Sequence, residues 1–271
     1  MIKIYNSISD AVAESLRFGD GEIYYPKSDS NDLKWFGYET PENTLRLSKT
    51  GNVQLVPEAE KVISQLETQL NTPRKVWRRN VAGAYASVPD YLAGLPTNMC
   101  VLRHEPTEHS PINIYVRPNA SAGVTAQQLQ KRGTVILALV MALSRSRPVS
   151  LWYYFCGDSK HMQSPRDYAN HTVIAIRIET APLNLAQACY LLTSAGFYRR
   201  LCMGLGHKLN KFIGGPVVSL NVSQTICFDL MGNDPERTLV IGPSTRDDPL
   251  LENPIQWLNE QLKKFNPQTG E

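Results

Sequence analysis

Apolar and polar residues follow one another along the chain in blocks that predict strands and helices in turn. Short runs rich in β-branched and aromatic residues predict strands over residues 2–5, 112–116, 149–156, 172–178 and 238–241. Residues 134–143 read TVILALVMAL, in which only the threonine is polar. A helix that is apolar on all sides has to be covered on all sides. We therefore predict a strand, a buried helix over residues 125–144 and a second strand, which together form the βαβ unit of a parallel sheet.

Start signals and apolar stripes predict the remaining elements. Helices are expected over residues 9–18, from Thr40-Pro41, from Val56-Pro57, over 183–211 with a break near 194–196, and from Asn253-Pro254. Two runs rich in β-branched residues, 217–221 and 225–230, predict short strands. The fold class is α/β: an open, mostly parallel Rossmann-like sheet with helices on both faces, plus an N-terminal helical and irregular extension.

The first 105 residues differ from the rest of the chain. Within them, the segment of residues 75–106 is broken by glycine and proline but carries Trp77, Tyr85, Tyr91 and Leu92. Large apolar residues are scarce in disordered linkers, so we expect an ordered arm that these side chains anchor to the core. The predicted division is an N-terminal extension and wrapping arm over 1–105 and an α/β core over 106–271.

Bulk composition narrows the location of the protein more than its function. The apolar runs reach about ten residues, whereas a membrane-spanning helix needs about 20, and polar residues interrupt the N-terminus where a signal peptide needs its apolar stretch. We expect no membrane contact and a cytoplasmic location. Five widely spaced cysteines fit free thiols. A net charge of +3 permits nucleic-acid contact without requiring it.

One stretch carries a resemblance to known families. After the strand at 112–116 comes a loop of small polar residues, Asn119-Ala-Ser121-Ala-Gly123, then Leu129-Gln-Lys-Arg132-Gly133 and the alanine- and leucine-rich helix. This order is similar to von Willebrand factor A-like domains. With Arg147-Pro148-Val149-Ser150-Leu151-Trp152 it resembles an uncharacterised protein family of tailed phages. The resemblance implies an A-like core and a role in protein–protein interaction.

The same comparison exposes a departure at the metal site. Metal-binding A domains carry D-x-S-x-S after the first strand, and the matching positions here are Arg117, Asn119 and Ser121. An arginine in place of the carboxylate puts a positive charge where Mg²⁺ needs hard oxygen ligands, so we expect the metal site to be lost. Loops after the strand C-termini surround the functional crevice in open α/β sheets. We therefore predict an interaction surface at this edge, formed by Arg117, Asn119, Ser121, Asp158, Glu179 and Asp247; the alternative is that these loops are simply solvated turns.

Candidate chemistry elsewhere is sparse. Cys100, His104 and His109 are close enough in the sequence to supply three zinc ligands from one loop, but they lack the paired spacing of structural zinc sites. Cys156 and His161 could pair as nucleophile and base, although a buried thiol beside a loop histidine is the commoner arrangement. We therefore expect a protein that is not an enzyme and binds no cofactor. Bound Mg²⁺ or Zn²⁺ stays an open alternative.

Two clusters combine basic and aromatic residues: Trp77-Arg78-Arg79 and Tyr198-Arg199-Arg200. Single-strand binders use cationic grooves with aromatic stacking platforms, so both clusters are candidate nucleic-acid contacts. The structural alternative is that the aromatics are core anchors flanked by solvated arginines. Two hypotheses result: a non-catalytic phage-type interaction module that binds another protein or its own copies, and a single-strand-binding accessory of phage replication or transcription.

Overall fold

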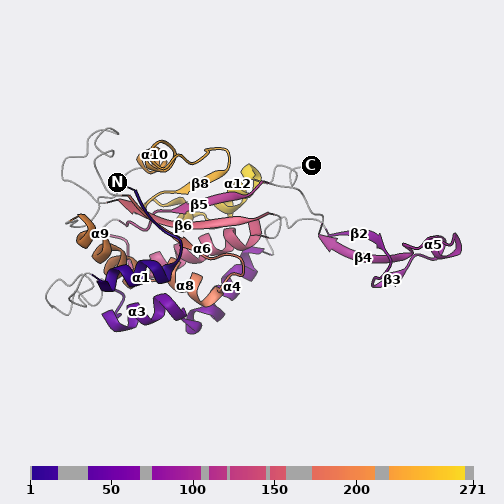
Figure 1. Ribbon diagram of the computed structural model, residues 1–271, viewed down its shortest axis with the longest axis horizontal. Coiled ribbons are helices and arrows are strands. Elements are labelled where there is room, and N and C mark those ends of the chain that lie inside the picture. The colour runs from indigo at the N-terminus through magenta and orange to yellow at the C-terminus, as the bar shows by residue number, and fades with distance from the viewer. Residues whose placement is uncertain are drawn as a thin grey trace.

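A five-stranded sheet forms the centre of the molecule in the part of the chain that the structure describes (Figure 1). The structure is a computed structural model, and it describes residues 2–17, 36–67, 75–104, 110–120, 123–144, 147–156, 173–210 and 220–265. The strand order is β1-β7-β6-β5-β8. The strands are β1 (Ile2–Tyr5), β5 (Ile112–Val116), β6 (Val149–Cys156), β7 (Val173–Ile178) and β8 (Thr238–Ile241). All neighbours run parallel except β6 and β7, so the predicted α/β class with a mostly parallel sheet is confirmed.

Helices cover both faces of the sheet. One face carries the long helix and its neighbours: α1 (Ile8–Arg17), α3 (Pro41–Thr50), α4 (Val56–Glu67), α6 (Ala126–Ser144), α8 (Leu185–Thr193), α9 (Met203–Asn210), α11 (Pro249–Glu252) and α12 (Pro254–Phe265). A short 3₁₀ turn, η1 (Val53–Leu55), precedes α4, and a π-helical segment, η2 (Phe197–Cys202), joins α8 to α9. The other face is covered by α10 (Leu220–Thr225) and the π-helical η3 (Ile226–Leu230).

The buried helix α6 connects the parallel neighbours β5 and β6, as the hydrophobic pattern predicts. Its apolar residues from Val135 to Val140 are at most 1% exposed. Helix α8 crosses it closely at Gly133, where an added Cβ would lie 2.2 Å from the carbonyl oxygen of Leu192. Glycine is therefore needed at this crossing, because a side chain would collide with the backbone of α8.

The predicted strand at 225–230 is wrong, and so is the end of the strand predicted at 217–221. Residues 220–230 are helical, and residues 217–219 lie outside the described chain. Ser223, Ile226 and Cys227 are fully buried, and the Tyr154 hydroxyl donates to the carbonyl of Ser223 at 3.0 Å. Packing one apolar stripe onto the sheet outweighed the local preference of β-branched residues for strands.

The N-terminal residues belong to the main body as well. Strand β1 pairs in parallel with β7 along its whole length, and α3 and α4 pack against α8 and α6. The predicted division between residues 105 and 106 therefore does not coincide with an edge of the central sheet. The N-cap at Thr40 is confirmed, since its hydroxyl accepts a hydrogen bond from the amide of Asn43 at 3.3 Å.

Residues 75–104, called the arm below, form a second, three-stranded sheet. Its order is β2-β4-β3, and its elements are β2 (Lys75–Asn80), β3 (Tyr85–Ala86), α5 (Val88–Leu92) and β4 (Met99–His104). Figure 1 shows the arm extending away from the body. The prediction that this segment wraps the core is therefore wrong, and its aromatic residues do not serve as core anchors.

Candidate functional site

Two residues of the predicted edge surface lie in the interior. Arg117 is 0% exposed and Asn119 is 1% exposed. Their backbone extends the pairing of β5 with the end of β8: the Arg117 amide donates to the Ile241 carbonyl at 2.9 Å, and the Ser244 amide to the Asn119 carbonyl at 2.8 Å. The prediction that these two side chains form an exposed contact surface is wrong, because the chain after β5 is covered rather than open.

The remaining residues of that prediction do not meet at one edge. Asp247 is exposed near the C-terminal end of β8. Glu179 follows β7, which runs antiparallel to β6, so it lies at the opposite end of the sheet beside Arg147 and Ser150. Placing it with Asp247 was wrong, because the direction of β7 cannot be read from its composition. Ser121 and Asp158 lie outside the described residues.

The second basic-aromatic cluster is part of the core. Tyr198, Arg199 and Arg200 are 6%, 4% and 2% exposed within η2. The Arg200 guanidinium lies 3.8 Å from the ring centroid of Phe36, in cation–π geometry. Burial lowers the pKa of Arg199 from its ordinary value. The prediction that these three side chains contact nucleic acid is wrong, since they cannot reach a strand outside the protein.

The first basic-aromatic cluster is on the surface of the arm. Trp77 is 47% exposed, and the centroid of its ring lies 4.6 Å from the ring centroid of Tyr85 in an edge-on arrangement. Arg78 and Arg79 are also exposed. Arg79 forms an ion pair at 2.8 Å with Asp90 of α5, which ties the short helix to β2. Side chains alternate between faces along a strand, so Trp77 and Arg79 share one face and Arg78 lies on the other.

Large apolar side chains gather at the far end of the arm and are open to solvent. This tip patch consists of Val81, Val88, Tyr91, Leu92 and Leu95, which are 41% to 78% exposed. Asp90 is the one buried side chain among those of the arm that the structure describes. The sequence analysis picked out Tyr91 and Leu92, but it predicted that they pack against the core. One sequence signal could have predicted their exposure. These large apolar residues lie between glycine and proline breaks and do not recur with the period of a helix or a strand, so no single face collects them for burial.

The proposed zinc ligands do not form one loop. Cys100 and His104 are four residues apart on β4. An extended strand rises about 3.3 Å per residue, so their Cα atoms are about 13 Å apart. That distance exceeds the reach of two ligands of one ion. His109 lies outside the described residues, as does His161, the proposed partner of Cys156. The described residues contain no cluster of three metal-ligating side chains.

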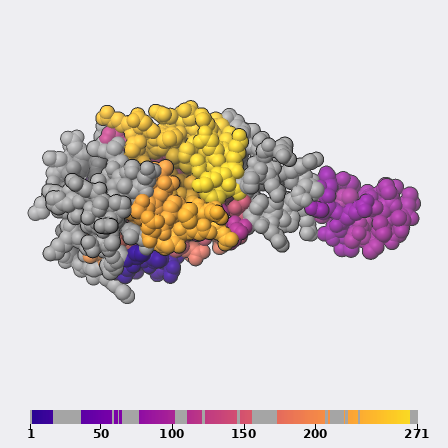
Figure 2. Space-filling model, turned by 90° about the horizontal axis from the view of Figure 1, so that it is seen from above, coloured from indigo at the N-terminus to yellow at the C-terminus, as the bar shows by residue number. Residues whose placement is uncertain are grey.

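A groove of about 490 Å³ runs along the free side of β8. One wall is formed by Leu220, Gln224 and Phe228 of α10 and η3. The opposite wall is formed by Leu250, Trp257, Gln261 and Lys264 of α11 and α12. Figure 2 faces this side of the molecule, where the orange-to-yellow C-terminal part of the chain comes together. The sequence gives no sign of this groove, because it depends on which strand ends the sheet.

A buried ion pair is among the groups that line the groove. Arg132 of α6 and Asp248 lie 2.9 Å apart with side chains only 5% and 4% exposed. Arg132 also donates to the carbonyl of Gly242, and Asp248 caps α11 by accepting from the amide of Leu250 at 3.1 Å. The pair therefore joins α6, the end of β8 and α11.

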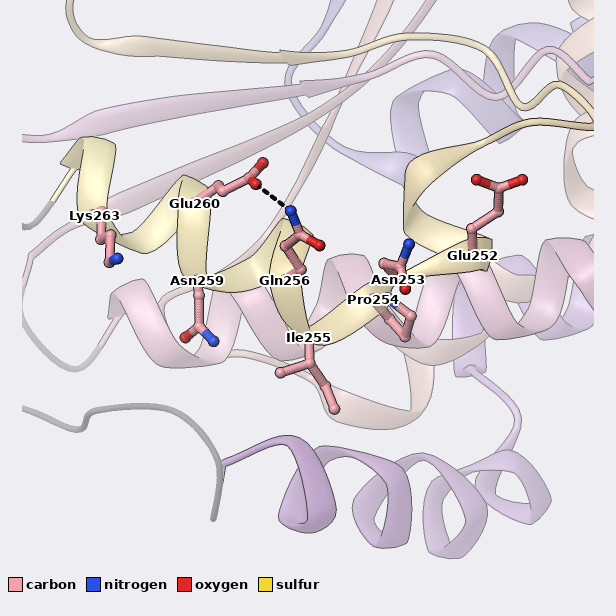
Figure 3. A pocket seen from close by; sticks show the side chains of 8 residues that line it. All are labelled: Glu252, Asn253, Pro254, Ile255, Gln256, Asn259, Glu260 and Lys263. Atoms are coloured by element: carbon pink, nitrogen blue, oxygen red, sulfur yellow. Dashed lines mark hydrogen bonds between the residues drawn. The ribbon is translucent and has the colours of Figure 1, made fainter.

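A second hollow, of about 760 Å³, lies beside α12 (Figure 3). Glu252, Gln256 and Glu260 point to one side of the helix, and Ile255, Asn259 and Lys263 to the other. Gln256 donates to Glu260 at 3.0 Å, so these two side chains bond to each other along the helix. Because the polar groups diverge, this hollow does not have the convergent donors and acceptors of a ligand site.

Comparisons with known proteins reach the family but not an activity. No curated protein and no solved structure matches the chain. No helix of the described residues is long and apolar enough to cross a membrane. A family described as "Domain of unknown function (DUF7192)" matches residues 1–241, which include the arm and β8 but stop before α11 and α12. Since this match covers most of the chain, the protein belongs to the DUF7192 family.

Proposed function

We propose that this protein is a non-catalytic protein-interaction module and that the arm carries its binding surface. The observation that supports the proposal most directly is the tip patch, where Leu92 is 78% exposed and Val81 68%. Seven of the thirteen large exposed apolar side chains of the described chain are on the arm, although it contains only residues 75–104. Exposed apolar surface gathered in one place is typical of contact sites for other proteins.

The energetics of the arm favour a partner. A three-stranded sheet gains independent stability by burying an apolar face, and the described side chains of the arm provide no such buried face. Burying one Leu or Val side chain fully contributes about 1.5–3 kcal/mol. Covering the five side chains of the tip patch would therefore stabilise the arm and the complex together.

The charge of the arm indicates which charge the partner carries around its apolar surface. The arm contains four basic residues (Lys75, Arg78, Arg79 and Arg103) and one acidic residue, Asp90, which gives it a net charge of +3. The whole chain also has a net charge of +3, so the rest of the protein is neutral on balance. An apolar pocket with an acidic rim complements such an arm and would accelerate encounter at low salt.

The A-like and phage-type parts of this proposal rest on the sequence resemblance. The order β5, loop, α6, β6 supports an A-like core, and a buried Arg117 supports loss of the metal site. This proposal places the interaction surface on the arm, whereas the sequence predicted it at the C-terminal edge of the strands.

Binding of single-stranded nucleic acid is the second candidate function. It is favoured by the concentration of positive charge on the arm, by the exposed rings of Trp77 and Tyr85, and by the exposed Arg78 on the opposite face of β2. Aromatic stacking contributes about 1–3 kcal/mol per base. The tip patch argues for the protein partner instead, because aliphatic side chains such as Val88 and Leu92 offer a base no stacking surface.

Site-specific cross-linking in the native cell tests the protein-partner proposal. A photoreactive residue replaces Leu92 in one variant and Val53 in the other; both positions are highly exposed, and Val53 is on the body. We expect a discrete cross-linked protein band from position 92 that position 53 does not give, and its loss when Tyr91→Asp is added. Equal band patterns from the two positions, or none from position 92, would refute the proposal.

Fluorescence anisotropy with a labelled single strand of about 20 nucleotides tests the second candidate. Binding by the arm predicts affinity that falls steeply between about 50 and 200 mM salt and weakens in Trp77→Ala and Arg78→Ala. Lys49→Ala, which removes a positive charge from α3 on the body, is the matched control. Absence of binding at the lower salt concentration would eliminate this candidate.

A further inference from the structure

We propose that the groove along β8 binds an extended peptide segment of another protein, which adds to the sheet as a further strand. This site is separate from the arm and does not depend on the function proposed for it. Three observations carry the inference: the orientation of the backbone groups of β8, the walls on both sides, and the charge at one end.

The backbone of β8 presents hydrogen-bonding groups to the groove. The Asn113 amide donates to the carbonyl of Arg237 at 2.8 Å, and the Arg117 amide to that of Ile241 at 2.9 Å. Backbone groups alternate in direction along a strand, so those of Thr238 and Val240 point away from β5. Among the described strands β8 pairs with β5 alone, which leaves these N–H and C=O groups facing the groove.

The side chain of Thr238 adds a second unsatisfied group. It lines the groove and is 1% exposed, and its hydroxyl has no hydrogen-bond partner within the described residues. Buried polar groups are nearly always hydrogen-bonded in native proteins. The groove therefore lies beside a group that the fold itself leaves unsatisfied, and an extended peptide would provide main-chain partners for the edge of β8.

The walls favour a single extended chain over a second copy of the protein. The four residues of β8 are at most 6% exposed, because α10 and η3 rise on one side and α11 and α12 on the other. The sheet edge of a second copy would bring its own flanking helices into these walls. A lone strand fits between them and can place alternate apolar side chains against Phe228 and Trp257.

Charge sets the chemistry of the peptide. Of the three charged residues that line the groove, Arg132 and Asp248 neutralise each other, and Lys264 pairs with no carboxylate among the described residues. Phe265, the next residue, accepts a hydrogen bond from Arg147, just before β6, so Lys264 lies near the end of the sheet where β8 begins. The peptide is therefore expected to carry apolar residues at alternate positions and a carboxylate near the start of β8.

Selection from a library of random heptapeptides displayed on a surface tests the site with the full chain as bait. We expect the recovered peptides to share β-branched or aromatic residues at alternate positions and an acidic residue at one end. Synthetic copies should bind Lys264→Glu about ten-fold more weakly or worse, and Leu220→Asp likewise. Lys263→Glu, the same charge change on the neighbouring residue outside the groove, should bind as the original chain does. Failure to recover any peptide, or equal binding by all three variants, overturns the proposal.

Amide hydrogen exchange tests the geometry directly. In the free protein the amide of Val240 should exchange faster than those of Leu239 and Ile241, which face β5. A selected peptide should slow exchange at Thr238 and Val240, and unchanged exchange there overturns strand addition even if the peptide binds. Light scattering over a range of concentrations identifies the other occupant: a dimer that Leu220→Asp dissociates would assign the groove to a second copy and overturn the peptide assignment.

Discussion

The buried ion pair between Arg132 and Asp248 makes a sharp prediction about stability. In Asp248→Asn the amide keeps the shape of the side chain and an oxygen that caps α11, but it removes the charge that compensates Arg132. Both side chains are about 95% buried and 2.9 Å apart, so the guanidinium would remain buried without a counter-charge. Breaking one partner of a buried pair costs about 3–5 kcal/mol. For a domain of this size each kcal/mol lowers Tm by about 2–4 °C, which predicts a loss of about 6–20 °C.

Urea unfolding of a double-mutant cycle measures this coupling. We expect Arg132→Met to destabilise the protein, because Asp248 is then buried alone, and the double variant Arg132→Met/Asp248→Asn to lose clearly less than the sum of the single losses. Asp234→Asn is the matched control, since Asp234 and Arg237 form a pair whose side chains are 54% and 60% exposed. Such exposed pairs contribute at most about 1 kcal/mol. Additive losses in the cycle, or a loss below about 1 kcal/mol in Asp248→Asn, would refute the reasoning.

Three further predictions concern the core and its thiols. Gly133→Ala should lower the free energy of unfolding by more than about 1 kcal/mol, because its Cβ would meet the carbonyl of Leu192; urea unfolding equal to that of the original chain would contradict the close crossing. Burial raises the pKa of Cys189 to about 11 and that of Cys227 to about 12. The folded protein therefore binds these protons more tightly than the unfolded chain, and the free energy of unfolding should fall by up to about 1.4 kcal/mol per pH unit for each group as pH rises above about 9. In a thiol-labelling assay at pH 8, Cys100, which is partly exposed, should react before the buried Cys189 and Cys227; simultaneous labelling would indicate local opening of the core.

The arm shows why part of the site could not be predicted. Trp77, Tyr91 and Leu92 are apolar enough to be core residues, and composition alone favours burying them. Whether they pack inward depends on where β2 and β4 leave the body, which is a property of the whole fold. The arm becomes a candidate contact surface because it extends into solvent while keeping its apolar residues exposed.

The sequence by itself determined the elements whose periodicity is strong. The helix segment over residues 134–143, in which only Thr134 is polar, had to be buried. A buried helix between two strands required parallel neighbours, so β5, α6 and β6 follow from local pattern alone. Tertiary structure decided everything that depends on neighbours distant in the chain: the reversal of β7 that separates Glu179 from Asp247, the burial of Arg117 and Arg200, and the helical state of residues 220–230. It also made β8 the edge of the sheet. The physical reason is that the hydrophobic period of a segment shows how much of its surface is covered. Which element covers it depends on the order and direction of the strands, and these are set by packing between distant parts of the chain.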